Sequence, residues 1–205
     1  VTDNYQNTFG GGATDMLLTV FNEDGELQWN TYIGGTGDEY GNQVTYMDND
    51  YIIVGGSTSS TSNVAVGGFQ TTYGGGISDG YMGVFNADGT MFWSSYVGGP
   101  AEDEVHDISI NMNNDIYLSG STASTSGIAT VGASQVSYGG GEYDAFVGQF
   151  TINGEKNWIT YFGGEGLDRG NGVAVDELGN VFLGGITSSL SNIFQSGFQT
   201  EIGGG

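Results

Sequence analysis

Short apolar runs alternate with glycine-rich turns along the whole chain, and each run has the length of a β-strand. Residues 15–21 lead to a turn at 23–25, and residues 27–33 return from it. The same turn is repeated as Asp-Gly at 88–89 and as Asn-Gly at 153–154. Between β-rich runs these dipeptides are strong hairpin signals, because glycine takes the positive φ that such turns require. The pattern therefore predicts a series of β-hairpins.

A second hairpin follows in each unit. In the first unit it consists of residues 43–46, a turn at 48–50 and residues 51–54, and its later copies turn at 113–114 and 178–179. No window shows sustained helical spacing with caps, and the density of glycine would penalise a helix throughout. We expect an all-β protein.

The strands differ in the pattern of their two faces. Residues 43–46 and 107–110 alternate polar with apolar, with Val44 and Tyr46 as the apolar positions of the first, as in a strand beside a solvated channel. Three other runs are apolar or glycine on both faces, and we expect neighbouring sheets to cover both: residues 16–21, 81–85 and 145–150. One solvated strand beside covered ones is typical of a β-propeller blade.

The whole pattern repeats. The triple glycine recurs four times, from Gly10 to Gly203, in steps of 64, 65 and 64 residues, and a glutamine recurs with the same steps from Gln6 to Gln199. A tryptophan and an aspartate recur three times in steps of 64 and 65 residues, from Trp29 to Trp158 and from Asp15 to Asp144. Self-similarity at such a period is the signature of a repeat architecture. We predict a β-propeller segment of four-stranded antiparallel blades, with about three repeats of 64–65 residues.

The expected segment begins and ends within a blade. It consists of an outer strand pair in 1–35, full blades at 41–98 and 105–163, an inner strand pair at 170–187 and a connection at 188–205. These strands amount to three blades, whereas closed propellers have about 4–8. We expect the pair around Asp15–Ile33 not to join the pair around Val173–Thr187 of the same chain. Each should instead pair with residues of a longer polypeptide or with other copies.

Composition supports a folded core. The chain has 205 residues, 37% apolar and 13% aromatic, and its 40 glycines occupy periodic positions. No apolar run approaches the roughly 18 residues of a membrane helix. There is no cysteine, which excludes disulfides and thiol catalysis. The sequence starts at Val1 without a visible signal peptide, and we expect a mature or excised segment.

The charge balance is extreme. The chain has 24 acidic residues and only two basic ones, Lys156 and Arg169, which gives a net charge of −22. This is far beyond the roughly 2–8 units usual for a small domain. Such a surface repels phosphate backbones and anionic membranes, so nucleic-acid binding is not expected. A surface rich in acidic residues and almost without lysine suits salty or calcium-containing surroundings, which screen its negative charge. We therefore expect an extracellular location.

The third repeat carries a family resemblance. Trp158, Tyr161 and the Gly-Gly at 163–164 precede Val-Ala-Val-Asp-Glu-Leu-Gly-Asn-Val-Phe-Leu-Gly-Gly-Ile-Thr-Ser-Ser at 173–189. This resembles the SBBP repeat of bacterial and archaeal secreted proteins, over essentially the whole chain. The usual Phe-Pro after Thr-Ser-Ser is replaced by residues 192–195. The resemblance implies a propeller in exported or cell-surface proteins, often of Bacteroidetes type with a sorting domain for type IX secretion, and no catalytic residues.

Acidic residues follow each Gly-Gly and allow two interpretations. In the first, Glu39, Asp103 and Asp168 accept backbone N–H bonds in tight loops. In the second, each blade holds a stabilising Ca²⁺, with candidate ligands Asp38, Glu39, Glu102, Asp103 and Asp168. The spacing matches neither an EF-hand nor a glycine–aspartate calcium repeat. The aspartates after the triple glycines are expected to cap the strand start: Asp15, Asp79 and Asp144.

Other candidate residues also have structural interpretations. One tryptophan per repeat favours a core between blades over a sugar-stacking set. His106 aligns with Asn42 and Asn171, which indicates a polar hydrogen-bonding position and not a catalytic base or metal ligand. Arg169 is expected to pair with Asp168 or Glu165 at the surface.

These patterns lead to a functional expectation. Two carboxylates could in principle perform acid–base catalysis, but none stand out from their copies, and we expect no enzyme. The Ser/Thr loops after each inner hairpin are expected to be flexible connections, or to present hydroxyls to a glycan: residues 57–62, 121–126 and 187–191. We expect a non-catalytic extracellular scaffold or adhesion propeller. The alternative is a carbohydrate-binding propeller that uses rim aromatics such as Tyr40 and Tyr73.

Overall fold

The protein is built entirely of β-strands in the part that the computed structural model describes, residues 5–47 and 50–193. Its strands are β1 (Met16–Phe21), β2 (Leu27–Ile33), β3 (Glu39–Met47), β4 (Tyr51–Thr58), β5 (Asp79–Asn86), β6 (Met91–Val97), β7 (Asp103–Ile110), β8 (Ile116–Thr122), β9 (Asp144–Phe150), β10 (Lys156–Phe162), β11 (Asp168–Val175) and β12 (Val181–Thr187). These described residues contain no helix that could cross a membrane. The predicted turn residues at 48–49, the last glutamine and triple glycine, and residues 194–205 of the predicted connection lie outside the described residues.

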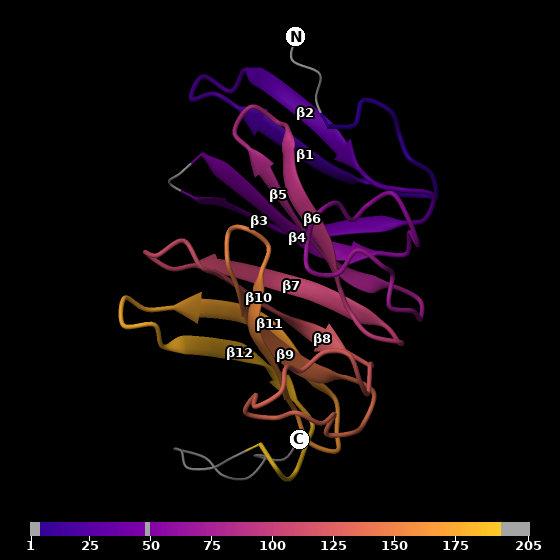
Figure 1. The fold of residues 1–205 in the computed structure, drawn as a ribbon, viewed down its shortest axis with the longest axis vertical. Helices are drawn as coiled ribbons and strands as arrows, with labels where there is room; N and C mark the ends of the chain where they lie inside the picture. The colour runs from indigo at the N-terminus through magenta and orange to yellow at the C-terminus, as the bar shows by residue number, and fades with distance from the viewer. Residues whose placement is uncertain (1–4, 48–49, 194–205) are drawn as a thin grey trace.

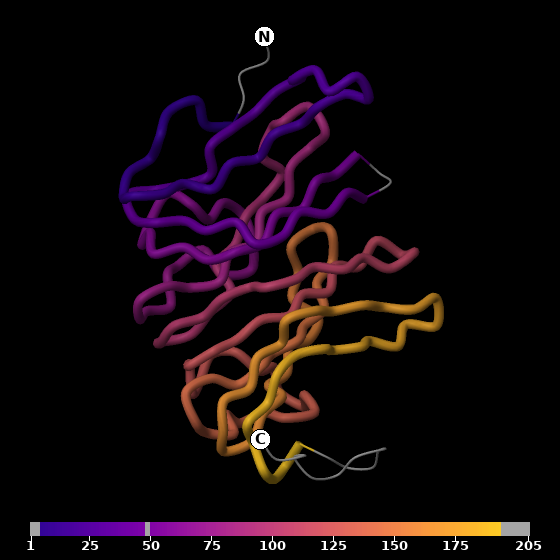
Figure 2. The backbone as a smooth tube through the Cα atoms, turned by 180° about the vertical axis from the view of Figure 1, so that it is seen from behind, coloured from indigo at the N-terminus to yellow at the C-terminus, as the bar shows by residue number. Residues whose placement is uncertain are grey.

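The strands form two complete blades flanked by two hairpins. One sheet has the order β3-β4-β5-β6 and the next β7-β8-β9-β10, and all pairs are antiparallel. β1–β2 and β11–β12 form separate two-stranded sheets. The blades follow one another along the molecule, with β1–β2 and β11–β12 at opposite ends (Figures 1 and 2). The predicted all-β class and four-stranded antiparallel blades are confirmed. The two terminal hairpins do not pair with each other, as expected, and the ring is open.

A β-bulge interrupts the first strand of each inner hairpin. The register shifts between Gly41 and Gln43 in β3, between Val105 and Asp107 in β7, and between Gly170 and Gly172 in β11. The inserted residues are therefore Asn42, His106 and Asn171. A bulge re-aims a side chain out of the regular alternation, and here it directs two of these side chains to the neighbouring blade. The Asn42 amide donates to the Val105 carbonyl over 2.9 Å.

The core lies between blades. One buried cluster joins β3–β6 to β7–β10 and includes Met82, Trp93 and Phe150; another joins β1–β2 to β3–β6 and includes Met16, Leu18 and Phe85. The tryptophans contribute one hydrogen bond at each of these two junctions, since Trp29 Nε1 donates to the Ala87 carbonyl and Trp93 Nε1 to the Ile152 carbonyl. The interpretation of the tryptophans as core between blades is thus confirmed at these two junctions.

The expectation that residues 16–21 are covered on both faces is wrong for one face. Leu17 and Phe21 are 63% and 60% exposed, whereas Phe150, at the same repeat position as Phe21, is fully buried. Val44 and Tyr46 are likewise each 57% exposed, although Ile108, which aligns with Val44, is 4% exposed. The physical reason is that, among the described residues, no sheet packs on the outer face of β1, and no inner strand pair lies beside β1 to cover Val44 and Tyr46 of β3.

Candidate functional site

The aspartate after each triple glycine holds the turn before its strand. Oδ2 of Asp15, Asp79 and Asp144 accepts the N–H of the first glycine over 2.6–2.7 Å. In the two complete blades the aspartate is fully buried. A glutamine strengthens the turn in each copy; Gln70, for example, donates to Asp79 and to the Thr72 carbonyl. The predicted capping role is confirmed.

The acid after each Gly-Gly holds a second loop. Glu39 accepts the Gly35 N–H over 3.1 Å, Asp103 the Gly99 N–H over 2.7 Å, and Asp168 the Gly164 N–H over 2.8 Å. Sequence reasoning missed the hydroxyl partners of these acids. Ser124 Oγ donates to Asp103 over 2.9 Å, and Ser189 Oγ to Asp168 over 2.7 Å. The loop-binding interpretation of these three acids is confirmed.

The Ser/Thr loops are part of this construction. Their central serines are fully buried, and each accepts a backbone N–H from the Gly-Gly loop: Ser60 from Gly37, Ser124 from Ala101 and Ser189 from Gly166. Buried hydroxyls that are already bonded cannot be presented to a glycan. The constant 64- and 65-residue spacing of these serines was the available signal.

At two junctions, two carboxylates lie together around one glycine, Gly34 or Gly98. A Cβ on Gly98 would lie 2.7 Å from the Asp79 carboxyl carbon and 2.8 Å from Asp103 Oδ2. Burial is the main cause that raises the pKa of Asp79 to about 7; the hydrogen bond from the Gly74 N–H opposes this shift, and the nearby Asp103 charge adds to it. Burial likewise raises the pKa of Asp103 to about 6 and that of Asp144 to about 6. These acids bind protons more readily than exposed ones.

The candidate calcium ligands do not converge. Asp38 Oδ1 accepts the Ala13 N–H over 2.5 Å, and Glu102 Oε2 accepts the Tyr143 hydroxyl over 2.5 Å, so both are engaged in contacts within the protein. Glu39, Asp103 and Asp168 belong to three different junctions. Within residues 5–47 and 50–193, no three His, Cys, Asp or Glu side chains are grouped to hold a metal ion. Calcium binding stays a prediction.

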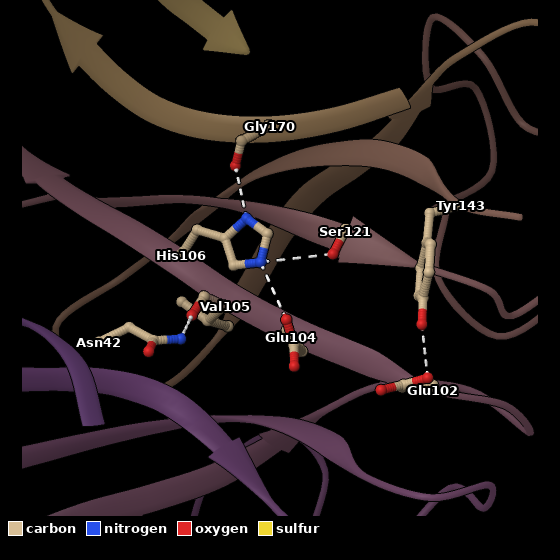
Figure 3. Close-up of polar contacts among 8 residues, drawn as sticks. All are labelled: Asn42, Glu102, Glu104, Val105, His106, Ser121, Tyr143 and Gly170. Atoms are coloured by element: carbon tan, nitrogen blue, oxygen red, sulfur yellow. Dashed lines mark hydrogen bonds and ion pairs between the residues drawn. The ribbon is translucent and has the colours of Figure 1, made fainter. Parts of the chain in front are cut away.

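A group of polar residues around β7 makes contacts that the other repeats do not have (Figure 3). His106 occupies the bulge, and its Nδ1 lies 3.2 Å from the Gly170 carbonyl of the next blade. A carbonyl only accepts, so Nδ1 carries the proton. His106 thus makes the same contact between blades that Asn42 makes one junction earlier, which agrees with its interpretation as a polar hydrogen-bonding position.

The other ring nitrogen of His106 faces two oxygens. Nε2 lies 3.1 Å from Glu104 Oε2 and 3.3 Å from Ser121 Oγ. When Nε2 also carries a proton it donates to Glu104, and this hydrogen bond lowers the pKa of Glu104. A catalytic triad places the serine on one ring nitrogen and the acid on the other. Here serine and acid share one nitrogen and a backbone carbonyl holds the other, so the geometry orients the histidine between strands and does not activate Ser121.

Arg169 lies beside this cluster. Its guanidinium stacks over the Tyr143 ring at 4.6 Å from the centroid. The expected pairing with Asp168 or Glu165 is wrong, because among the described residues the one contact within 4.0 Å between a basic nitrogen and a carboxylate is His106–Glu104. Burial and the bond to Glu102 raise the pKa of Tyr143 to about 12. A planar cation over an aromatic ring is a stable arrangement, but the sequence spacing held no signal for it.

The two rim aromatics proposed for glycan contact differ. Tyr40 is 54% exposed. Tyr73 donates its hydroxyl to the Gly76 carbonyl and packs edge-on against Tyr96 at 5.7 Å. Tyr73 is therefore part of its loop, and Tyr40 is the one of the two that a glycan could reach.

Comparison with known proteins identifies the repeat. A protein-family model described as the SBBP beta-propeller repeat matches residues 157–194, which span β10 to β12 and the start of the following loop. No curated protein matches the chain. The matched stretch contains Trp158, the second acid Asp168, the bulge at Asn171 and the buried Ser189, all of which recur in the preceding blade. Residues 157–194 of the chain are thus an SBBP-type β-propeller repeat.

Proposed function

We propose that this chain is a non-catalytic scaffold or adhesion segment of an extracellular, cell-surface propeller. The observation that carries the proposal is the use of its repeated polar residues. Asp79, Asp103 and Ser124 bond loops to one another and are fully buried. Residues that hold loops at every junction are typical of a rigid platform.

The cluster around His106 supports the same proposal. It departs from the repeat, as catalytic sites usually do, yet its histidine bridges two blades in the manner of Asn42. The acidic exterior, with a net charge of −22, supports a location where salt or calcium screens it. The open blade edges are proposed to pair with further residues of a longer polypeptide or with other copies.

A glycan array tests the proposal against the lectin alternative. The scaffold role predicts no specific glycan bound by the wild-type chain and no turnover of glycoside substrates. Tyr40→Ala is the informative variant, because Tyr40 is exposed, and Phe92→Ala, another exposed aromatic, is its control. Specific binding that Tyr40→Ala abolishes and Phe92→Ala preserves would establish the lectin function instead.

A further inference from the structure

Acidic side chains of neighbouring blades meet in pairs at the blade junctions. Asp79 begins β5 of one blade, Asp103 begins β7 of the next, and both lie against Gly98. An added Cβ on Gly98 would be 2.7 Å from the Asp79 carboxyl carbon and 2.8 Å from Asp103 Oδ2. Asp144 of β9 and Asp168 of β11 occupy the same positions one repeat later. We call Asp79–Asp103 and Asp144–Asp168 the junction carboxyl pairs.

The junction carboxyl pairs are shut off from solvent. Asp79, Asp103 and Asp144 are fully buried, and Asp168 is 2% exposed. An ionised carboxylate in such a place loses its hydration, which is costly unless a cation or hydrogen-bond donors replace the water. Two ionised carboxylates close to each other also repel. Each pair therefore favours a state with fewer than two negative charges.

The protein supplies no positive charge to these pairs within its described residues. The chain has one lysine and one arginine, Lys156 and Arg169, and both cations lie over aromatic rings. Among residues 5–47 and 50–193, the one contact within 4.0 Å between a basic nitrogen and a carboxylate is His106–Glu104. In the same residues no third His, Cys, Asp or Glu is grouped with a pair to hold a metal ion. A proton, in contrast, needs no ligand besides the two carboxyl groups.

The titratable groups around the pairs are acids and phenols. The charge of Glu102 opposes a charge on Asp103. Four tyrosines near the pairs have raised pKa values, first because of burial and then because of the nearby carboxylates: Tyr73, Tyr96, Tyr138 and Tyr161. These phenols stay neutral at physiological pH, so none of these neighbours offsets the charge of the pairs.

The second pair has acceptor oxygens without donors. Oδ2 of Asp144 accepts the Gly139 N–H over 2.6 Å, and Oδ2 of Asp168 accepts the Gly164 N–H over 2.8 Å. Oδ1 of both acids is buried without a hydrogen-bond partner among the described residues. A buried acceptor without a donor is costly. A protonated carboxyl group is also a donor, so one proton on this pair would supply what the two oxygens lack.

We propose that each junction carboxyl pair shares one proton between its two acids, and that this proton makes the contact between the two blades depend on pH. With the proton bound, one acid can donate to the other across the junction, and the pair carries at most one negative charge. When the proton is lost, two like charges remain together in a site without solvent, and the junction is weakened.

The pKa values of these acids give the pH range. Burial is the main cause that raises the pKa of Asp79 from 3.8 to about 7, that of Asp103 to about 6 and that of Asp144 to about 6. The charge of the partner acid adds to the shifts of Asp79 and Asp144. A raised folded-state pKa gives stability that is full below the unfolded value of 3.8 and is lost as the pH rises through 6 to 7. The blades are therefore held together most firmly in mildly acidic surroundings.

Urea unfolding between pH 5 and 7.5 tests the first pair with amide variants, which keep an acceptor oxygen and cannot take up the proton. The unfolding constant of the wild-type chain should rise with pH. Asp79→Asn and Asp103→Asn should each reduce this rise by at least about tenfold, the effect of one proton over one pH unit. The double variant should reduce it by less than the product of the two single effects, because each acid raises the proton affinity of the other.

Asp88→Asn is the matched control. Asp88 is an exposed turn aspartate whose pKa is lowered by hydrogen bonds from Thr90, so this variant should keep the wild-type rise. An unchanged rise in both junction variants would overturn the proposal. So would single effects that simply multiply in the double variant, because the two acids would then titrate independently.

Infrared spectroscopy of the folded chain detects the proton without unfolding. The wild type should show a band of protonated carboxyl groups at pH 5 that decreases towards pH 7.5 and is weaker in Asp103→Asn. Absence of this band from the wild type at pH 5 would overturn the proposal even if the variants failed to fold. The proposal goes beyond the scaffold role and does not depend on it, since the glycan array tests that role separately.

Discussion

The buried carboxylate of Asp103 offers a quantitative test of how the blade junctions are built. Its Oδ2 accepts both the Gly99 N–H, at 2.7 Å, and the Ser124 hydroxyl, at 2.9 Å, and the side chain is fully buried. Asp103→Asn keeps one oxygen for both donors and removes the charge. Asp103→Ala removes the acceptor as well.

The pH dependence follows from the pKa of Asp103, which burial raises from 3.8 to about 6. A raised folded-state pKa means that the folded state binds the proton more tightly, so this stabilisation is full below pH 3.8 and is lost as the pH rises through 6. Between pH 5 and 7.5 the wild type should lose about 1.4 kcal/mol relative to Asp103→Asn, which has no proton to lose. Both pH values lie above the sequence pI of 4.1, which favours solubility.

The alanine variant isolates the hydrogen bonds. It leaves the Gly99 N–H and the Ser124 hydroxyl without their acceptor, at a cost of about 1–3 kcal/mol each. Asp103→Ala should therefore be less stable than Asp103→Asn by about 2–6 kcal/mol at every pH. Urea unfolding at pH 5 and 7.5 gives these free energies. A constant offset between wild type and Asp103→Asn across this range would refute the buried-carboxylate reasoning.

Three further predictions concern single positions and calcium. Gly120→Ala should abolish folding, because the added Cβ would collide with the Glu104 carbonyl oxygen. In Gly179→Ala the added Cβ meets no atom, so thermal melting should show a loss of stability of only about 1–2 kcal/mol, caused by the φ of 83°. His106→Asn should melt within a few degrees of the wild type, because an amide can also donate to the Gly170 carbonyl, and His106→Leu should melt lower. Millimolar Ca²⁺ at matched ionic strength separates the two interpretations of the loop acids: if they only bond backbone N–H groups the melting temperature should be unchanged, whereas the predicted calcium sites should give a calcium-specific rise.

The hairpins and the loop acids were predictable from sequence because they recur. Asp79 and Asp103 stand at fixed distances from glycines that only a tight turn explains, and their copies repeat the pattern. An acid at one position after a glycine is a weak signal for a turn, but the same spacing in every repeat is a strong one. The hydrogen bonds from Gly74 to Asp79 and from Gly99 to Asp103 agree with that spacing.

The rest depends on contacts that a periodic pattern does not contain. Phe21 and Phe150 occupy the same repeat position, but one is 60% exposed and the other buried, because burial depends on whether a neighbouring blade is present. The bulge at His106 adds one residue to a strand that reads as regular alternation. Arg169 stacks on the Tyr143 ring and does not pair with an acid. The sequence could not predict this contact, because stacking between residues of different blades has no characteristic spacing.

Glycan binding by the wild-type chain tests the proposed scaffold role most directly. We expect that no glycan on an array is bound specifically and that no glycoside substrate is turned over. Specific glycan binding that Tyr40→Ala abolishes and Phe92→Ala preserves would contradict the scaffold role, because both aromatic side chains are exposed and only Tyr40 is a candidate contact.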